Sequence, residues 1–599
     1  MKYILYLIII KKLYLLMDDL EEEINPEKLE DFKVPEDEPI KKLRRKRLLI
    51  LLSFFLVAVV IIIVIPIFVN KFKKSQKYYS IVCKMITHST NELVQIINKE
   101  AIENINYQLI INGTKVGQIT EYNFQYPGEH LITFRFDEEL NSLGAFFYGI
   151  DKLTEIDLSD INPDAFANIT RLFTDCESLK IIKFGKALKN IHYMDEIFSG
   201  CNSLLELDLS SFNTEQVENM GRIFSGCHSL TSIDLGHLNT NSVNNMEGMF
   251  SGCYSLYEID LTSFNFGEVQ DMSYMFSNCQ NLVNISFIEL NITSLKRMTG
   301  LFMECRSLKN LDLHEFKTSN VEDMSLLFYN CKQLESLVIS NFETEKVDNM
   351  YKMFSNCESL NSLDLSSFNT ESVRNMKEML HNCRNLTDIN FGNNFITKNV
   401  IYFESQFANC SSLKKLDLSS FETPEATEME NMFAGCSSLT ELNINSFKTN
   451  KLNNVKHMFE GCTNLKSIDL SFLKDSKGIA FSSGMFKNCI SLETITFPQL
   501  HSFFLFETDE MFYGCKNLKS IDFSNVNTLS VKNMENMFYN CSSLEYLDIS
   551  KFNTRSLKIY NGIFEGIQNS SDFTIKYNIN KTEEISNEIL DSWSKTIIS

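Results

Sequence analysis

Apolar residues recur along residues 150–567 with a period of about 26 positions. The clearest marker is cysteine: of 16 cysteines, all but one stand 25 to 27 residues apart in a single column. Ile150 and Ile567 occupy the same phase one step beyond each end, which makes about 17 units. A fixed period of this length predicts an array of stacked repeats rather than several separate domains. The column cysteines are Cys176, Cys201, Cys227, Cys253, Cys279, Cys305, Cys331, Cys357, Cys383, Cys410, Cys436, Cys462, Cys489, Cys515 and Cys541.

The unit between Cys201 and Cys227 shows what each repeat is expected to form. Leucines alternate with acidic residues over 204–209, which predicts a short strand. Thr214 fits a helix N-cap, and apolar residues over 217–224 recur at helical spacing. The position before the column residue is Gly or Asn in nearly every unit, as at Gly226, and both residues tolerate the left-handed conformation that ends a helix. Each unit is therefore predicted to be strand, turn, helix and cap.

Two further columns supply the predicted core. Leucine stands three residues after the cysteine phase, from Leu153 to Leu544, and phenylalanine three residues before it, from Phe147 to Phe564, with Leu380 as the substitute. One strand and one helix cannot bury these residues alone, so stacked neighbours must do so. Strands stack about 4.8 Å apart and helices about 8–10 Å apart. The predicted fold is an α/β solenoid, a curved array resembling leucine-rich repeats with a parallel sheet on the concave face.

The repeat also carries a recognisable signature. The sequence Met-Phe-Ser-Gly-Cys-Tyr-Ser-Leu at 249–256, followed by Ile-Asp-Leu at 259–261, resembles the 26-residue repeat of the BspA-like leucine-rich-repeat surface proteins. This resemblance covers about 150–567 and implies a leucine-rich-repeat fold in a surface protein used for adhesion or host and matrix interaction. A membrane anchor before the repeats departs from many bacterial relatives, which are exported by a signal peptide.

Residues 48–69 form one uncharged apolar stretch, long enough for a transmembrane helix. Six basic residues precede it within 41–47 and four follow it within 71–77, which favours a cytoplasmic N-terminus. The prediction is a single-pass protein of the cell membrane, with residues 1–47 as a cytoplasmic tail and the repeats outside. Met17 is an alternative first residue.

The segments on either side of the array lack the repeat. Residues 70–142 are predicted to be a juxtamembrane linker and a small β module that caps the solenoid of 143–567, because Asn112-Gly113 and Pro127-Gly128 separate apolar runs as hairpin turns do. An independent ligand-binding domain is the alternative for that module. Residues 568–599, with Trp593 on one apolar helix face, are predicted to be a C-terminal cap with a helix.

Composition narrows the possible functions. Apolar residues make up 44% of the chain, which excludes a mainly disordered protein, and the net charge of −21 excludes nucleic-acid binding through bulk charge. The histidines share no repeat phase, and no phosphate-binding or nucleophile motif occurs, so no catalytic, metal or cofactor set is predicted and the chain is expected not to be an enzyme. The column cysteines lack zinc-type spacing and are expected to be buried structural thiols.

The candidate ligand-binding residues form an aspartate column seven residues after the cysteine phase. In ten of the units an aspartate is expected to project from the sheet, and neighbouring carboxylates about 5 Å apart repel each other. One interpretation is that hydrogen bonds to nearby serines and backbone groups compensate this repulsion. The other is that calcium or a basic ligand binds the carboxylates. Bound calcium should raise the melting temperature of the protein. The column contains Asp157, Asp208, Asp234, Asp260, Asp312, Asp364, Asp417, Asp469, Asp522 and Asp548.

Two functions remain open from the sequence. The first is a membrane-anchored surface protein that mediates adhesion, or binds extracellular or host proteins or glycans, along the solenoid surface. The second is a receptor-like or structural scaffold whose repeats face the cytosol, where free thiols are usual.

Overall fold

The computed structural model describes residues 79–185, 188, 190–287, 292–476, 479–497, 503–523, 526–549, 556–567, 574–576 and 597–598. Contacts divide the chain into residues 1–77 and 78–599, and every described residue belongs to the second unit. The predicted C-terminal helix around Trp593 lies outside the described residues.

The predicted membrane-spanning segment, 48–69, also lies outside the described residues. Among the residues that are described, no helix has the length and apolar character needed to cross a bilayer. The structure therefore gives no support to the single-pass location with its cytoplasmic N-terminus and outward repeats, and that location is withdrawn.

Six strands precede the repeats, and four of them extend the sheet of the first repeat strands. β1 is bonded antiparallel to β6 on one side and to β7 (Leu153–Asp157), the first repeat strand, on the other; β7 is parallel to β8 (Ile181–Lys183). The resulting sheet has the order β4-β3-β6-β1-β7-β8, while β2 and β5 form a separate antiparallel pair. β1 thereby covers the open edge of the first repeat strand. The elements are β1 (Tyr79–Thr87), β2 (Glu92–Gln95), 3-10 helix η3 (Glu100–Ile102), β3 (Tyr107–Ile111), β4 (Thr114–Val116), β5 (Glu121–Phe124) and β6 (Gly128–Phe136).

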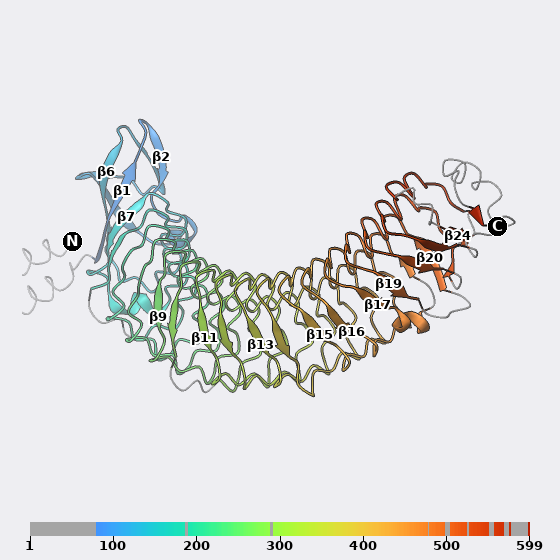
Figure 1. The fold of residues 1–599 in the computed structure, drawn as a ribbon. Coiled ribbons are helices and arrows are strands. Elements are labelled where there is room, and N and C mark those ends of the chain that lie inside the picture. Colours follow the sequence, from blue (N-terminus) through green and yellow to red (C-terminus); the bar gives the residue numbers. More distant parts are fainter. Residues whose placement is uncertain are drawn as a thin grey trace, which may run out of the picture. The chain divides into compact units, whose positions relative to one another are not determined.

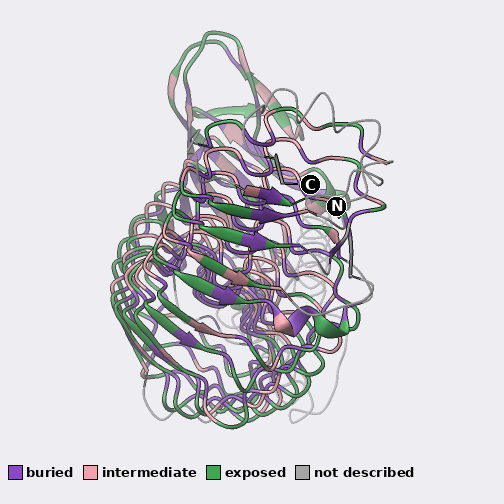
Figure 2. Cartoon of the chain, turned by 45° about the vertical axis from the view of Figure 1, so that its right-hand side comes forward, coloured by how far each residue is buried: buried purple, intermediate pink, exposed green. Residues whose placement is uncertain are grey.

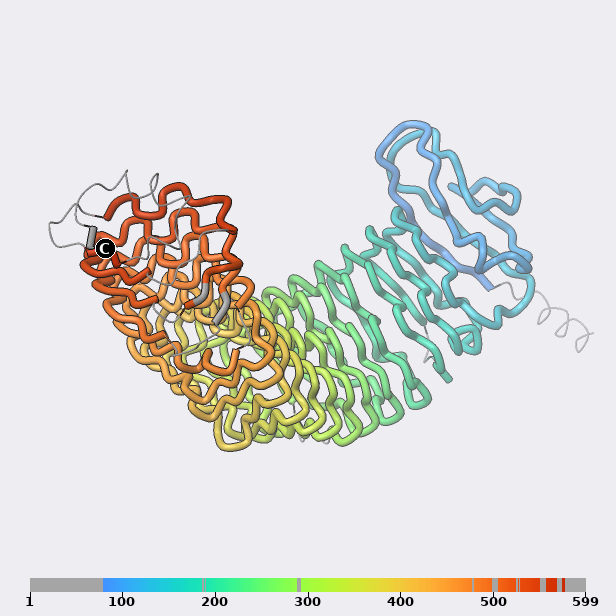
Figure 3. The backbone as a smooth tube through the Cα atoms, turned by 90° about the vertical axis from the view of Figure 1, so that its right-hand side faces the viewer, coloured from blue at the N-terminus to red at the C-terminus, as the bar shows by residue number. Residues whose placement is uncertain are grey.

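The repeats wind a β-solenoid in which successive turns lie one against the next (Figures 1 and 3). Most turns contribute one short parallel strand whose middle residue points into the core. The strands are β9 (Glu258–Asp260), β10 (Asn284–Ser286), β11 (Asn310–Asp312), β12 (Ser336–Val338), β13 (Ser362–Asp364), β14 (Asp388–Asn390), β15 (Lys415–Asp417), β16 (Glu441–Asn443), β17 (Ser467–Asp469), β19 (Thr494–Thr496), β21 (Ser520–Asp522), β23 (Tyr546–Asp548), β24 (Thr574–Lys576) and β25 (Ile597–Ile598).

Five further elements interrupt the regular turns. They are the 3-10 helices η4 (Pro163–Ala167) and η5 (Ser471–Asp475) and the strands β18 (Ile479–Phe481), β20 (Phe503–Glu507) and β22 (Val526–Asn527), which form a three-stranded parallel sheet.

The strands of the central turns bond in pairs rather than as one continuous sheet. β9 pairs with β10, β11 with β12, β13 with β14, β15 with β16, and β17 with β19. The sequence carries the same doublet, because the residue after the aspartate phase is leucine in the first strand of each pair, as at Leu313, and phenylalanine or isoleucine in the second, as at Ile339. The N–H of Leu313 donates to the carbonyl of Val338 and fixes the pair. The structural period is therefore two repeats.

The predicted helix of each unit is wrong: no α-helix occurs in the residues that the structure describes. In turn 243–253, alternate N–H groups donate to carbonyls of the next turn, namely those of Met246, Gly248, Phe250 and Gly252 to Asp271, Ser273, Met275 and Ser277. The N–H groups of Met249, Ser251 and Cys253 donate to the carbonyl three residues earlier, and that of Glu247 donates to Asn245 Oδ1. The segment is thus a series of β-turns whose remaining donors bond across turns. The correct fold class is a β-solenoid whose described residues form no α-helix, only short 3-10 helices beside the strands.

The apolar spacing that favoured a helix has a different cause here. Each β-turn brings a side chain inward about every three residues, which is close to the helical repeat of 3.6. Val217, Met220 and Ile223 are fully buried in this way. Both sides of each turn stack through backbone hydrogen bonds. The difference between helix spacing and strand spacing that predicted a concave sheet is therefore absent.

Thr214 illustrates the correction at one residue. Instead of capping a helix, its buried hydroxyl donates to the carbonyl of Asn239 in the next turn and accepts the Asn239 N–H, both at 2.8 Å. Thr240 repeats this arrangement with Asn265. A buried hydroxyl that satisfies both groups of its neighbour stabilises the stack, because an unpaired buried polar group is costly.

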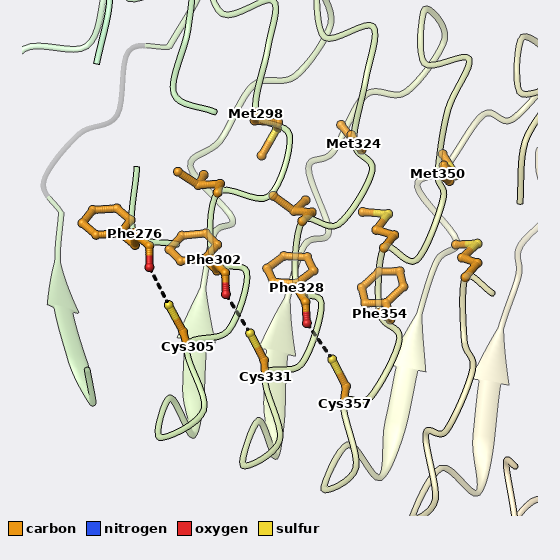
Figure 4. Close-up of a cluster of buried hydrophobic side chains, with 14 of the residues drawn as sticks. Phe276, Met298, Phe302, Cys305, Met324, Phe328, Cys331, Met350, Phe354 and Cys357 are labelled. Carbon is orange, nitrogen blue, oxygen red and sulfur yellow. Dashed lines mark hydrogen bonds between the residues drawn. The ribbon is translucent and has the colours of Figure 1, made fainter. Parts of the chain in front are cut away.

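The phenylalanine and cysteine columns form the predicted core. The rings stack from turn to turn with centroids 5.6 Å apart for Phe276–Phe302 and 5.9 Å for Phe302–Phe328. Every column thiol donates to the carbonyl of the phenylalanine-column residue in the previous turn, as Cys331 Sγ does to Phe302 at 3.1 Å (Figure 4). All 16 cysteines are buried and free, so their predicted structural role is confirmed.

Two positions in every turn have left-handed backbone. One is the residue before the column cysteine, where the recurrence of Gly and Asn predicted a left-handed conformation. The residue closes a β-turn there and not a helix. The other lies five residues before the cysteine and was not predicted, because many residue types occupy it, including Leu326 with φ 60° and Ser405 with φ 55°. The left-handed region costs a residue with a Cβ about 1–2 kcal/mol.

We expect Ser405→Gly to raise the free energy of unfolding by about 0.5–1 kcal/mol, because relief of the left-handed strain exceeds the entropy that glycine adds to the unfolded chain. Ser405→Ala retains a Cβ and should stay within about 0.5 kcal/mol of the wild type. Urea unfolding followed by circular dichroism compares the two variants. Equal stability of the glycine and alanine variants would contradict the expectation.

Candidate functional site

The exposed side chains of the repeat strands and of the equivalent segments in other turns make up one polar surface, which we call the strand face. Within β13, Leu363 is buried while Ser362 and Asp364 are exposed, and the same order recurs along the array (Figure 2). Strands in register place equivalent residues on neighbouring turns about 4.8 Å apart. The strand face therefore presents several long rows of side chains.

The aspartate column lies on this face. In the eight members for which the residue two positions later is described, one carboxylate oxygen accepts the backbone N–H of that residue. For example, Asp208 accepts from Ser210 at 2.9 Å and Asp417 from Ser419 at 3.0 Å. The hydrogen-bonding interpretation of the column is thus realised locally. The eight are Asp157, Asp208, Asp234, Asp260, Asp312, Asp364, Asp417 and Asp469.

These hydrogen bonds hold the carboxylates in their charged form. Hydrogen bonds from Ser210 lower the pKa of Asp208, the Thr262 N–H lowers the pKa of Asp260, and Ser366 lowers the pKa of Asp364. A hydrogen bond donated to a carboxylate stabilises its charged form over the neutral acid. Asp208, Asp260 and Asp364 are therefore negatively charged at neutral pH.

In the paired strands, each aspartate has an uncharged neighbour in register. Asp312 lies beside Val338, and Asp364 lies beside Asn390, whose amide donates to the Asp364 carboxylate at 3.0 Å. Asp522 and Asp548 lie together, but Lys576 Nζ is 2.9 Å from the Asp548 carboxylate. The doublet thereby keeps like charges apart along most of the array.

The exception is the run Asp208, Asp234 and Asp260, which occupies three successive turns. All three are exposed. The strand predicted over 204–209 does not form, and neither 204–209 nor 230–235 joins a strand ladder in the structure as described. Like charges directly opposite each other destabilise strand pairing, which accounts for the interruption.

Asp234→Asn is expected to raise the melting temperature, because it removes the middle charge of this run and supplies an amide like that of Asn390. Asp364→Asn is the matched control: it removes an aspartate with no charged neighbour in register and should not stabilise the protein. Differential scanning calorimetry at low and high salt separates the effects, since salt should reduce the gain. A lower melting temperature for Asp234→Asn would exclude charge repulsion as the cause.

Calcium binding stays a prediction. In the described ranges, no three His, Cys, Asp or Glu side chains group closely enough to hold a metal ion.

A second row of side chains was missed from the sequence. On the other side of the turns, Asn or Asp residues eight positions before the cysteine accept the N–H two residues later, as Asn245 does from Glu247 at 2.9 Å. Backbone bridges link successive members, including Asn219 to Asn245 and Asn245 to Asp271. The recurrent Asn-Met pair, as at 245–246, was the available signal, but the helix interpretation placed it inside a helix.

Comparison with known proteins agrees with the repeat. The family described as Mycoplasma protein of unknown function, DUF285, matches residues 167–288, 296–415, 386–499 and 482–594. The family of the BspA type leucine rich repeat region matches residues 70–172. No curated protein matches the chain.

Three solved structures show weaker likeness. A leucine-rich repeat protein from Eubacterium ventriosum is 15% identical over 70% of this chain and 84% of its own, with a TM-score of 0.27. A Leptospira interrogans LRR protein is 12% identical over 75% and 91%, with a TM-score of 0.19. The functional domain of InlJ from Listeria monocytogenes, described as including a cysteine ladder, is 14% identical over 58% and 73%, with a TM-score of 0.18. On the two family matches, the chain belongs to the DUF285 family and to the BspA-like leucine-rich-repeat proteins.

Proposed function

We propose that this protein is a non-catalytic recognition protein that binds a protein or glycan partner along its strand face, as in adhesion. The observation that supports this is the strand face itself: rows of exposed polar side chains on short strands whose central residues are anchored in a continuous core. A rigid backbone with exposed, variable side chains binds a partner at low entropic cost. Contacts distributed over many turns give affinity without a deep pocket.

Binding of the full-length protein to arrays of matrix proteins and glycans tests the proposal. Once a ligand is found, Ser362→Arg with Ser467→Arg places two bulky cations on the strand face, in β13 and β17. Gln270→Arg with Asn453→Arg makes the same charge change at exposed positions outside the strand face. We expect the first pair to weaken binding at least tenfold and the second to leave it unchanged. Equal binding by both would place the ligand elsewhere.

A further inference from the structure

One part of the strand face exposes two large apolar side chains more fully than Ile181, Val338 and Tyr546 elsewhere on that face, which are 47%, 38% and 37% exposed. Leu205 and Tyr257, both four residues after a column cysteine, are 53% and 55% exposed. Thr231 and Val283 occupy the same position, four residues after Cys227 and Cys279, in the turn between those two and in the turn after Tyr257. The Tyr257 N–H donates to the carbonyl of Thr231 and the Val283 N–H to that of Tyr257, so these residues lie on consecutive turns. They form a row, which we call the apolar row.

Carboxylates run beside the apolar row. Glu206 and Glu258 occupy the next position along their turns, and three members of the aspartate column follow two residues later. All five are exposed, and among the described residues none forms an ion pair with lysine or arginine. The five carboxylates are Glu206, Asp208, Asp234, Glu258 and Asp260.

Later turns neutralise acidic residues on the same face. Lys415 Nζ is 2.7 Å from the Glu441 carboxylate, and Lys519 Nζ is 3.6 Å from that of Glu493. The turns that carry Leu205 and Tyr257 therefore hold five exposed carboxylates without a lysine or arginine ion pair, beside exposed apolar surface. The segments 204–209 and 230–235, which join no strand ladder in the structure as described, fall in the same place.

We propose that the turns from Leu205 to Val283 are the docking surface for a cationic, amphipathic polypeptide segment of a partner protein. Apolar side chains of that segment cover Leu205 and Tyr257, while its lysines or arginines face the five carboxylates. Each aspartate accepts its turn N–H through one oxygen, and its side chain stays exposed to a partner cation. The tyrosine ring adds a face that attracts cations. This proposal rests on the proposed function and names its partner class.

Three synthetic peptides of equal length test this inference: alternating Lys-Leu, alternating Lys-Ser and alternating Glu-Leu. Fluorescence anisotropy with the full-length protein should show the tightest binding for Lys-Leu, weaker binding for Lys-Ser and none for Glu-Leu. Because the charges are exposed, raising the salt from about 50 to 300 mM should weaken the Lys-Leu complex.

Variants locate the binding. Leu205→Ser with Tyr257→Ser, and Glu206→Gln with Glu258→Gln, should each weaken Lys-Leu binding at least tenfold. The control is Val338→Ser with Glu441→Gln, which removes an exposed apolar residue and a carboxylate from later turns of the same face. If the control weakens binding as much as the site variants, or if Glu-Leu binds as well as Lys-Leu, the inference is overturned. A different outcome would reject this inference alone. If the Ser362 and Ser467 substitutions weaken binding of a ligand while the Lys-Leu peptide does not bind at all, the proposed function is retained.

Discussion

Phe302→Ala is expected to lower the free energy of unfolding by about 3–5 kcal/mol, because it removes a fully buried ring and leaves a cavity in the stack. The ring lies between those of Phe276 and Phe328, nearly parallel to both, with interplanar angles of 7° and 1°. Neighbouring turns cannot close the gap, since their backbones are bonded at strand spacing. Guanidinium unfolding followed by circular dichroism measures the loss.

Phe302→Leu is the matched control, because Leu380 already occupies the same column and its carbonyl accepts the thiol of Cys410. A smaller apolar residue that keeps most of the volume should cost less than about 1.5 kcal/mol. If the alanine and leucine variants lose equal stability, cavity formation is not the cause.

The protein is expected to unfold steeply as the pH rises above about 9. Burial raises the pKa of the column thiols, to about 12 for Cys227, Cys279 and Cys436. An unfolded thiol ionises near 8.5. Because the folded pKa is the higher one, the contribution to stability is complete below the unfolded value and is lost as the pH rises toward the folded value. Each buried thiol removes about 1.4 kcal/mol per pH unit in this window.

Circular dichroism between pH 7 and 12 gives the alkaline transition, and the uptake of a thiol reagent counts the exposed cysteines. We expect almost no reaction in the native state and reaction of all 16 after unfolding. Cys331→Ala removes one titrating group and should reduce the steepness of the transition. Native protein that reacts rapidly near pH 8 would show that the thiols are not held neutral by burial.

The repeat and its core could be predicted from the sequence because burial constrains residue type. A position that accepts Phe in nearly every unit, or Cys flanked by Ile150 and Ile567, must be an interior one. The conformation between these positions could not be predicted in the same way. Val217, Met220 and Ile223 satisfy both a helix and a series of β-turns, and the residue that separates the two is the left-handed position at Arg222, which no glycine marks.

The candidate site was predicted only at the level of single residues. The aspartate column is where it was expected, and hydrogen bonds to nearby backbone groups were one of its two interpretations. Its alternation with uncharged neighbours was not predicted, because it depends on strand pairing. The alternation of Leu313 with Ile339 indicates the pairing of strands by twos, but a 26-residue period treats all units as equivalent and does not show it. The apolar row was not predicted, since Leu205 and Tyr257 look like ordinary strand residues until their exposure is known.

Pairing of strands by twos limits how such an array can lengthen or shorten. Loss of one repeat between β11 and β17 would give every later strand a new partner, and loss of the β12, β14 or β16 repeat would bring two aspartates side by side. Loss or duplication of two repeats would retain each partner and its charge pattern. Evolution of this gene, and any engineered version of the protein, should therefore tolerate changes in array length mainly in even steps.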